Sequence, residues 1–221
     1  MSAGQSRTIP ADVALGSLVS RLVDTERFRD FAGDGAAARA RVSEPLLPLV
    51  VAALFMVRSG PLVVLVPDDA EARDLAEAAG WFVGPEAVGL FASRGVRVDS
   101  GLESPAHLVG ERARALDVLG KSGLVCASAV GLGEALPPAR LRPEPIELRA
   151  GAELSVDAVA EALALAGYQR VERVEARGDF AVRGGLIDVF TPGAEAPLRL
   201  DLFGDTLESI RRFDPLSQRT S

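Results

Sequence analysis

Few side chains in this sequence are of the types that carry out covalent or metal chemistry. The chain has one cysteine, Cys126, and one histidine, His107, which together form neither an intramolecular disulfide nor a Cys/His zinc site. Asp68 and Asp69 follow an apolar run, where catalytic acids or metal ligands can sit, but the pair would also cap a helix starting there, and we favour capping. Because no nucleophile motif accompanies His107, we expect a surface or capping histidine, and in its apolar run Cys126 is expected to be an inert core residue.

A phosphate-binding loop is missing from the place where an α/β domain would carry it. Such a loop combines glycine amides with Lys-Ser or Lys-Thr at the start of a helix. The corresponding segment reads Arg41-Val42-Ser43-Glu44-Pro45, in which Glu44 repels phosphate and Pro45 has no amide donor. Gly131-Leu132-Gly133 resembles the start of a dinucleotide fingerprint but lacks its third glycine. We therefore expect no cofactor, no metal and no catalytic residue.

Arginines recur in the last third of the chain, within short apolar segments separated by glycines. The ordered pattern comprises Arg177-Gly178-Asp179-Phe180, Val182-Arg183-Gly184-Gly185, a strand ending at Phe190, then Phe203-Gly204-Asp205 and Ser217-Gln218-Arg219-Thr220. Arginine presents a planar fork of donors to carboxylates, and arginine and aromatic residues are enriched at protein interfaces. Taken alone, these residue types fit equally well a solvated charge at a strand end and a core phenylalanine.

Helices and strands are expected to alternate over residues 11–136. Apolar residues three and four apart predict helices from Ala11 and around Phe28, the latter ending at 33–35. Ser43-Glu44-Pro45 predicts the start of a buried helix over 46–57. Strand 62–66 is apolar without alternation, so we expect it to be covered on both faces. Further strands are expected at 88–91, 96–98 and 123–128 and helices at 70–79 and 107–119, which predicts an open, mostly parallel sheet.

A cluster of prolines at 137, 138, 143 and 145 marks a domain boundary, because proline removes an amide donor and disfavours helix before it. A second, smaller α+β domain is expected over 141–213. Alternation of Leu198, Leu200 and Leu202 with polar neighbours predicts a sheet with one buried face. Its expected elements are a short strand from Ile146, a helix over 156–166 and antiparallel strands at 170–174, 180–182, 186–190, 198–203 and 206–210.

Composition narrows the class of protein. The chain has 221 residues, 48% hydrophobic and 25% charged, as in folded domains, and this length suits two small ones. A net charge of −7 disfavours direct DNA binding, because a phosphate backbone attracts positive charge. The longest apolar run, Leu46–Val57, falls short of the ~20 residues of a membrane span, and Met1–Asp12 lacks a secretory signal. We therefore expect no membrane partner and a cytoplasmic location.

Residues 165–221, with the ordered pattern above, resemble the UvrB interaction domain that the excision-repair protein UvrB shares with the transcription-repair coupling factors (Mfd). Gly184-Gly185 and the ending Ser217–Thr220 favour the coupling factors. Their first module resembles the UvrB domain that carries a Walker motif, but with that motif degenerated, as here. The resemblance implies an α/β fold: a degenerate P-loop or helicase-like domain with an open, mostly parallel sheet over 11–136, and a second, smaller antiparallel α+β domain over 141–213.

The resemblance also implies where this chain sits in a longer protein. Residues 214–221 would begin the return to the large domain. The chain would be an N-terminal piece, and the ATP-binding and helicase motifs of the motor and the RNA-polymerase-binding domain would lie further along the polypeptide. This piece would then not be an enzyme, although the full-length family member resembles an ATP-dependent DNA translocase.

In this family the small domain binds UvrA, the damage-recognition ATPase of nucleotide excision repair. A residue-by-residue match gives as expected UvrA contacts Arg170, Arg183 and Phe190, with Arg173 and Arg177 widening the basic patch. UvrB has a further arginine at the position of Ala181, so part of that charge is missing here. The implied function is a non-catalytic adaptor that binds UvrA and recruits nucleotide excision repair to stalled RNA polymerase.

Two other functions stay open at this point. One is an ATP- or DNA-handling enzyme domain of the UvrB or helicase type, in which Asp68 and Asp69 would take part in catalysis. The other is an autoinhibitory clamp, in which the small domain would contact C-terminal domains beyond this sequence and hide the UvrA surface. The clamp and the adaptor are compatible, because one surface can serve both in turn.

Overall fold

A computed structural model describes residues 7–33, 38–97, 99–136, 138, 140 and 146–220. These residues fold into two compact units. One unit takes the described residues up to Ser104 together with Glu111–Glu134, and the second takes Pro105–Gly110 together with those from Ala135 onward. None of the described helices has both the length and the apolar composition needed to cross a membrane.

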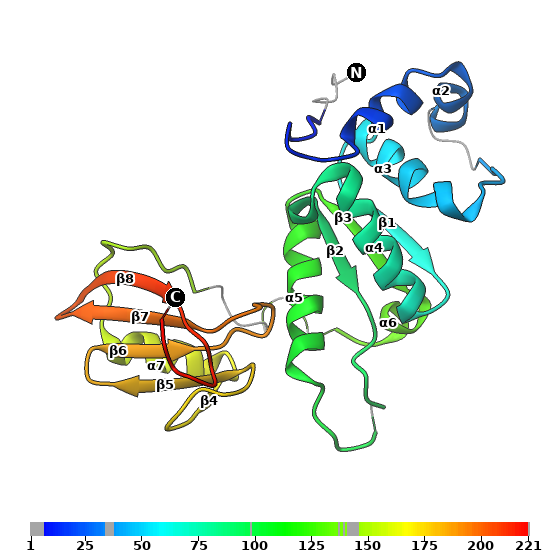
Figure 1. The fold of residues 1–221 in the computed structure, drawn as a ribbon. Helices are drawn as coiled ribbons and strands as arrows, with labels where there is room; N and C mark the ends of the chain where they lie inside the picture. The colour runs from blue at the N-terminus through cyan, green and yellow to red at the C-terminus, as the bar shows by residue number, and fades with distance from the viewer. Residues whose placement is uncertain are drawn as a thin grey trace. The chain divides into compact units, whose positions relative to one another are not determined.

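The first unit is built around a three-stranded sheet (Figure 1). The strand order is β1-β3-β2, and both neighbouring pairs are parallel, as the alternation of helices and strands predicted. The elements in chain order are α1 (Gly16–Val23), α2 (Glu26–Ala32), the 3-10 helix η1 (Glu44–Leu46), α3 (Leu47–Val57), β1 (Leu62–Val66), α4 (Asp69–Val83), the 3-10 helix η2 (Pro85–Ala87), β2 (Val88–Phe91), α5 (Ala106–Gly120), β3 (Leu124–Ser128) and α6 (Ala129–Gly133).

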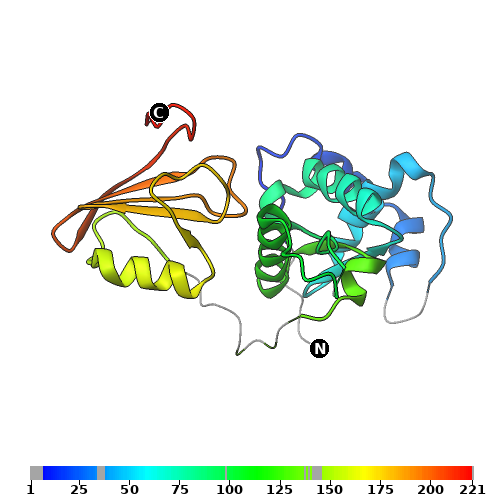
Figure 2. The same cartoon turned by 90° about the horizontal axis from the view of Figure 1, so that it is seen from below.

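The middle strand β3 is buried along its whole length, and its side chains alternate between two cores. Leu124 and Cys126 join the cluster that contains α3 and α4 residues. Val125 and Ala127 join a second cluster with Ala115 and Val118 of α5. Helices therefore cover the sheet on both faces, which Figure 2 also shows.

The expectation that residues 62–66 are covered on both faces is wrong. β1 is an edge strand, and Val63 and Leu65 are 45% and 58% exposed. Leu62, Val64 and Val66 pack in the main core, whereas α5 packs on β2 and β3 residues of the opposite face. An unbroken apolar run therefore indicated the strand correctly but not how much of it is covered.

Other sequence expectations in this unit need smaller corrections. Residues 96 and 97 form no strand, and residue 98 lies outside the described residues. α4 extends to Val83, four residues beyond the predicted end. Gly33 is the C-cap of α2 as predicted, while Gly35 and the boundary prolines 137, 143 and 145 fall outside the described part of the chain.

The second unit is a five-stranded sheet with one helix on it (Figures 1 and 2). The strands follow chain order, β4-β5-β6-β7-β8. Ser155 caps α7 by accepting a hydrogen bond from the Ala158 amide. The elements are α7 (Val156–Leu165), β4 (Gln169–Arg170), β5 (Asp179–Arg183), β6 (Leu186–Val189), β7 (Leu198–Phe203) and β8 (Thr206–Arg212).

Strand alternation divides this sheet into an apolar face and a polar face. The apolar face packs with Val159 and Leu163 of α7 and consists of Phe180, Val182, Ile187, Val189, Leu198, Leu200, Leu202, Leu207 and Ile210. β5 to β8 are antiparallel as predicted. β4 is shorter than expected and pairs parallel with β5, and residues 146–149 form no strand.

The end of the chain folds back on the second unit. Phe213 pairs with Thr220 in an isolated bridge and packs with Val174, Ala181 and Phe190 in a small cluster on the side of the sheet away from α7. The Gln218 side chain donates to the Val174 and Pro215 carbonyls. Residues 213–220 thus contribute to this unit, and a return to the large domain after them stays a prediction.

Candidate partner-binding surface

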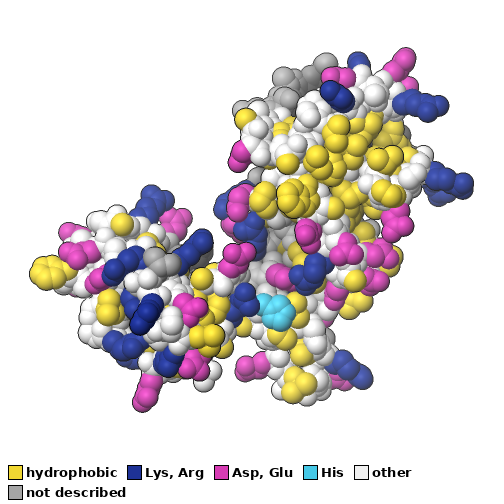
Figure 3. Space-filling view, viewed as in Figure 1, with side chains coloured by type: hydrophobic (Ala, Val, Ile, Leu, Met, Phe, Trp, Pro, Cys, Tyr) yellow, Lys and Arg dark blue, Asp and Glu magenta, His cyan; other side chains and the backbone are white. Residues whose placement is uncertain are grey.

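The polar face of the small sheet carries the arginines of the sequence pattern. Ala181, Asp188, Arg199 and Arg211 lie side by side across β5 to β8, and Arg183, Leu186 and Asp201 form the next row. We call the five charged residues of these rows the arginine face: Arg183, Asp188, Arg199, Asp201 and Arg211. Seen from the side shown in Figure 1, α7 lies behind the sheet, and Figure 3 shows basic side chains interspersed with acidic ones over this unit.

Asp188 is the centre of the arginine face. Its residue is only 2% exposed, yet its carboxylate accepts three charged hydrogen bonds. Oδ1 accepts from Arg199 Nε at 2.7 Å, and Oδ2 accepts from Arg199 Nη2 at 2.8 Å and from Arg183 Nη2 at 2.7 Å. Because a buried charge is tolerated only when it is paired and hydrogen-bonded, the two arginines are what allows a carboxylate here.

The two arginines on Asp188 differ in exposure. The Arg199 side chain is 17% exposed, and the Arg183 side chain is 51% exposed. Arg199 also lies 4.6 Å from the centre of the Phe213 ring and donates to the Gln218 carbonyl at 3.3 Å. The hydrogen bond to Asp188 raises the pKa of Arg199, an effect that outweighs the cost of its burial. Arg199 is therefore a fixed part of the sheet, whereas Arg183 reaches solvent.

A second ion pair completes the arginine face. Arg211 Nη2 lies 2.9 Å from Asp201 Oδ2, with both side chains partly exposed. Phe203 stands two residues beyond Asp201, on the same side of β7 by alternation, and its ring is exposed. Arginine and aromatic side chains are both enriched at protein interfaces, so exposed examples of each on one face of the sheet suit a binding surface.

The structure does not bring Arg170 and Arg183 to the same face. Arg170 pairs in register with Phe180, whose side chain lies on the α7 side, whereas Arg183 lies on the opposite side. Both belong to the β4–β5 edge of the sheet, and Arg170 is exposed. Among the described residues we find no hydrogen bond or ion pair from the Arg170 guanidinium, so this edge presents an unpaired cation.

Arg173 and Arg177 lie in the loop between β4 and β5, and both guanidinium groups bind backbone carbonyls. Arg173 Nη2 donates to the Leu216 carbonyl at 2.5 Å. Arg177 Nε donates to the Ala194 carbonyl at 3.1 Å, and its guanidinium lies 5.3 Å from the centre of the Phe190 ring. Both residues are exposed, so each has a structural role and still borders the surface.

Phe190 is placed as a core residue. It is 7% exposed and packs with Val174, Ala181 and Phe213. This placement agrees with the alternative that Phe190 is a core residue. A direct contact of its ring with a partner stays a prediction. Ala181 is equally buried, and the register puts it directly opposite Asp188.

Sequence reasoning missed Asp188, Arg199, Asp201 and Arg211 as parts of this surface. The available signal was alternation: Asp188 interrupts the apolar run Leu186–Phe190, and Arg199 and Asp201 alternate with leucines. Polar residues at that period mark the open face of a sheet, but which charges meet depends on strand register.

The two adjacent glycines of the sequence pattern are required by the tight turn between β5 and β6. Gly184 has φ +59°, and a Cβ at Gly185 would lie 2.4 Å from the Leu202 carbonyl oxygen.

The acidic pair of the first unit has structural roles. Asp68 caps α4 by accepting the Glu71 amide at 2.9 Å, as predicted. Asp69 instead accepts the backbone amide and the hydroxyl of Ser93 at 2.9 and 2.5 Å. Burial acts to raise the pKa of Asp69, but hydrogen bonds from Ser128 and Ser93 outweigh it and the pKa is lowered. A carboxylate held in its charged form by these donors links the ends of β1 and β2.

The remaining sequence candidates are His107, Cys126 and the segment at Glu44 and Pro45. His107 is exposed in the first turn of α5, in the part of that helix that belongs to the second unit. Cys126 is buried in β3, where desolvation raises its pKa to about 12. Glu44 and Pro45 begin η1, and the described residues before them, 38–43, include no strand. Among the described residues no three His, Cys, Asp or Glu side chains gather as a metal site would require.

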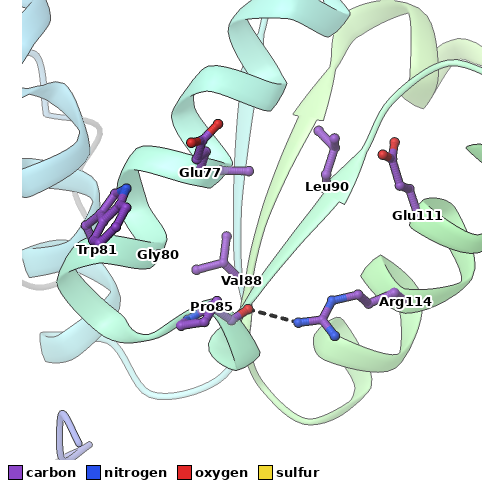
Figure 4. A pocket seen from close by; sticks show the side chains of 9 residues that line it. Glu77, Gly80, Trp81, Pro85, Val88, Leu90, Glu111 and Arg114 are labelled. Carbon is purple, nitrogen blue, oxygen red and sulfur yellow. Dashed lines mark hydrogen bonds between the residues drawn. The ribbon is translucent and has the colours of Figure 1, made fainter. Parts of the chain in front are cut away.

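A shallow groove lies along β2 between α4 and α5 (Figure 4). Its volume is about 390 Å³, and its lining includes Trp81, Val88 and Leu90. Arg114 at its rim donates to the Pro85 carbonyl at 3.0 Å, and Glu111 is paired with Arg73 at 2.7 Å. Arg114 and Glu111 are thus engaged with neighbouring residues. Sequence reasoning did not point to this groove, although the exposed Trp81 is the only tryptophan.

Comparison with known proteins identifies the second unit as a member of a known domain family. The family model described as UvrB interaction domain matches residues 146–221. The transcription-repair-coupling factor of Myxococcus xanthus is 37% identical over 182 residues, covering 77% of this chain and 15% of that protein. The factor of Mycobacterium tuberculosis is 31% identical over 222 residues, covering 95% of this chain and 18% of that protein. The factor of Escherichia coli is 30% identical over 174 residues, covering 77% of this chain and 15% of that protein.

The second unit is therefore a UvrB interaction domain: a five-stranded sheet with a helix on one face and paired charges on the other. The similarity extends into the first unit, since it reaches 95% of the chain. The chain belongs to the transcription-repair-coupling factor family and spans less than a fifth of the length of the curated relatives it matches.

Proposed function

We propose that this chain binds UvrA through the arginine-bearing edge and face of its second unit. The observation that carries the proposal is Arg183: in a UvrB interaction domain, it combines an anchored guanidinium with a half-exposed side chain. One of its Nη atoms is held by Asp188, and no described residue binds its other N–H donors, which can therefore meet acceptors of a partner. Such an arginine suits carboxylates or backbone carbonyls on UvrA, because its fork of donors binds them with defined geometry.

Arg170 extends the proposed contact around the β4–β5 edge, and Arg173 and Arg177 border it. Acidic residues lie among these arginines: Arg173 is 3.5 Å from Glu175, and Arg183 is paired with Asp188. The edge therefore carries charges of both signs, and the proposed contact depends on where individual guanidinium groups are placed. Complementary charges of this kind set the orientation and rate of association more than they set affinity.

The role proposed for the chain in DNA repair is that of an adaptor without catalysis of its own. By binding UvrA as part of a transcription-repair-coupling factor, it would recruit nucleotide excision repair to a stalled RNA polymerase. Two features support this proposal: the segment before α3 offers a carboxylate and a proline in place of a phosphate cradle, and Asp69 is used in hydrogen bonds to serines. A rise in melting temperature with Mg-ATP would contradict the non-catalytic assignment.

Calorimetric titration of the 221-residue chain with purified UvrA tests the binding proposal. We expect Arg183→Ala to weaken binding about tenfold or more, because truncation of an interface arginine commonly costs more than 1 kcal/mol. Arg149→Ala is the matched control: Arg149 is exposed in the same unit and pairs only with Glu147, as far as the described residues show. Equal affinities of wild type and Arg183→Ala would remove Arg183 from the contact, and no binding by the wild type would refute the proposed function.

A further inference from the structure

Asp188 has the position of a residue that acts on a partner without touching it. Its side chain is closed off from solvent, so it makes no contact with a protein docked on the arginine face. Among the described residues, its carboxylate accepts hydrogen bonds only from guanidinium groups, two from Arg199 and one from Arg183. The question for this residue is therefore what it does to those two arginines.

The three bonds have different consequences for the two arginines. Arg199 grips both carboxylate oxygens and is further held by Phe213 and the Gln218 carbonyl, so it fixes the carboxylate in place. Arg183 takes one bond, through Nη2, on the oxygen that Arg199 Nη2 also uses. In the described part of the chain this is the one polar contact of the Arg183 side chain. Without Asp188, nothing in the sheet would hold Arg183 in a single orientation.

Strand register explains why Asp188 can reach Arg183. Arg183 pairs with Leu186 across the β5–β6 hairpin, so Asp188 is its diagonal neighbour, two residues along β6 on the same side of the sheet. The residue directly opposite Asp188 is Ala181, whose short side chain leaves the carboxylate to Arg183. The tight turn at Gly184 and Gly185 joins the two strands and fixes this diagonal.

We propose that Asp188 is a positioning residue of the partner surface: with Arg199 it forms a buried clamp that holds the Arg183 guanidinium in its binding orientation. The inference rests on the proposed UvrA contact of Arg183. A long side chain that is already ordered loses less conformational freedom on binding. Removing the clamp therefore weakens binding although no atom of the interface is deleted, and the expected loss is about three- to tenfold.

A double-mutant cycle measured by calorimetry with UvrA tests the clamp. The variants of the 221-residue chain are Asp188→Asn, Arg183→Ala and the double variant. The control is Glu147→Gln, which removes an exposed carboxylate of the same unit that pairs with Arg149 and lies outside the arginine face. We expect Asp188→Asn to bind three- to tenfold more weakly than wild type. The double variant should bind no more weakly than Arg183→Ala, because the aspartate acts through Arg183, and Glu147→Gln should bind like wild type.

Each outcome separates the clamp from a merely structural role. Asp188→Asn lowers the melting temperature in both the wild-type and the Arg183→Ala background, but its effect on binding should exist only in the first. Additive losses of affinity, or a folded Asp188→Asn variant that binds like wild type, would overturn the proposal. Failure of wild type itself to bind UvrA would instead refute the proposed function.

A measurement on the wild-type chain keeps the clamp testable if Asp188→Asn does not fold. Nitrogen-15 NMR resolves the two Nη groups of an arginine when rotation about its Nε–Cζ bond is slow, and averages them when the group is free. We expect resolved Nη signals for Arg183, assigned from their loss in Arg183→Lys, and averaged signals for Arg170. Averaged Nη signals for Arg183 would show that no clamp exists, whatever its affinity for UvrA.

Discussion

The two arginines that share Asp188 should differ sharply in what they contribute to stability. Arg199→Ala removes both bidentate hydrogen bonds from a carboxylate that is 2% exposed, and the packing on Phe213. Breaking a buried ion pair in this way costs about 3–5 kcal/mol. Arg183→Ala removes one bond from a side chain that is half exposed, and Asp188 keeps Arg199 on both oxygens, so we expect a loss of at most about 1 kcal/mol.

Amide hydrogen exchange of β6 and β7 is the suitable assay, because a chain of two units need not unfold in a single two-state transition. A difference of about 3 kcal/mol between the variants corresponds to roughly a hundredfold difference in protection factor. The first unit supplies an internal control, since β3 amides should exchange alike in wild type and both variants.

Equal destabilisation by the two substitutions would refute this reasoning. It would mean that Arg183 stabilises the sheet as much as Arg199 does. Weaker UvrA binding by Arg183→Ala would then reflect damage to the sheet and not the loss of a contact. A small effect of Arg183→Ala, by contrast, makes the binding experiment with that variant interpretable.

Two further predictions concern the scaffold. Burial raises the pKa of Cys126 to about 12. At pH 8 its thiol should therefore not react with Ellman's reagent until denaturant unfolds the first unit. Rapid reaction of the native chain would contradict the burial of Cys126. Gly185→Ala would place a Cβ 2.4 Å from the Leu202 carbonyl oxygen and should destabilise the second unit by about 1–3 kcal/mol, measured by exchange of β5 and β6 amides; unchanged protection would show that this contact relaxes freely.

The sequence predicted the second unit well because its signals are local. Alternating leucines and glycine turns located β5 to β8, and the helix predicted over 156–166 ends within a residue of α7. The parallel sheet of the first unit followed from alternating helices and strands. The exposure of Val63 and Leu65 did not follow, because an apolar run indicates a strand but not which elements cover it.

The site was predicted less completely because it depends on pairing between strands. Arg183 was identified from a motif, but its link to Asp188 and Arg199 requires the register of β5, β6 and β7, which no single segment encodes. The opposite placement of Arg170 depends on the parallel pairing of β4 with β5, where antiparallel strands were expected. Phe190 lies in a strand-end position whose burial is decided by residues up to Phe213, far along the chain.

The placement of Arg170 and Arg183 on opposite sides of one sheet margin constrains the shape of anything that engages both. A flat epitope laid on either side reaches only one guanidinium. A partner that contacts both must approach the β4–β5 margin itself, either edge-on or by extending over both sides of it. Two contacts on opposite sides of the margin would also fix the orientation of the bound domain more tightly than two contacts on one side.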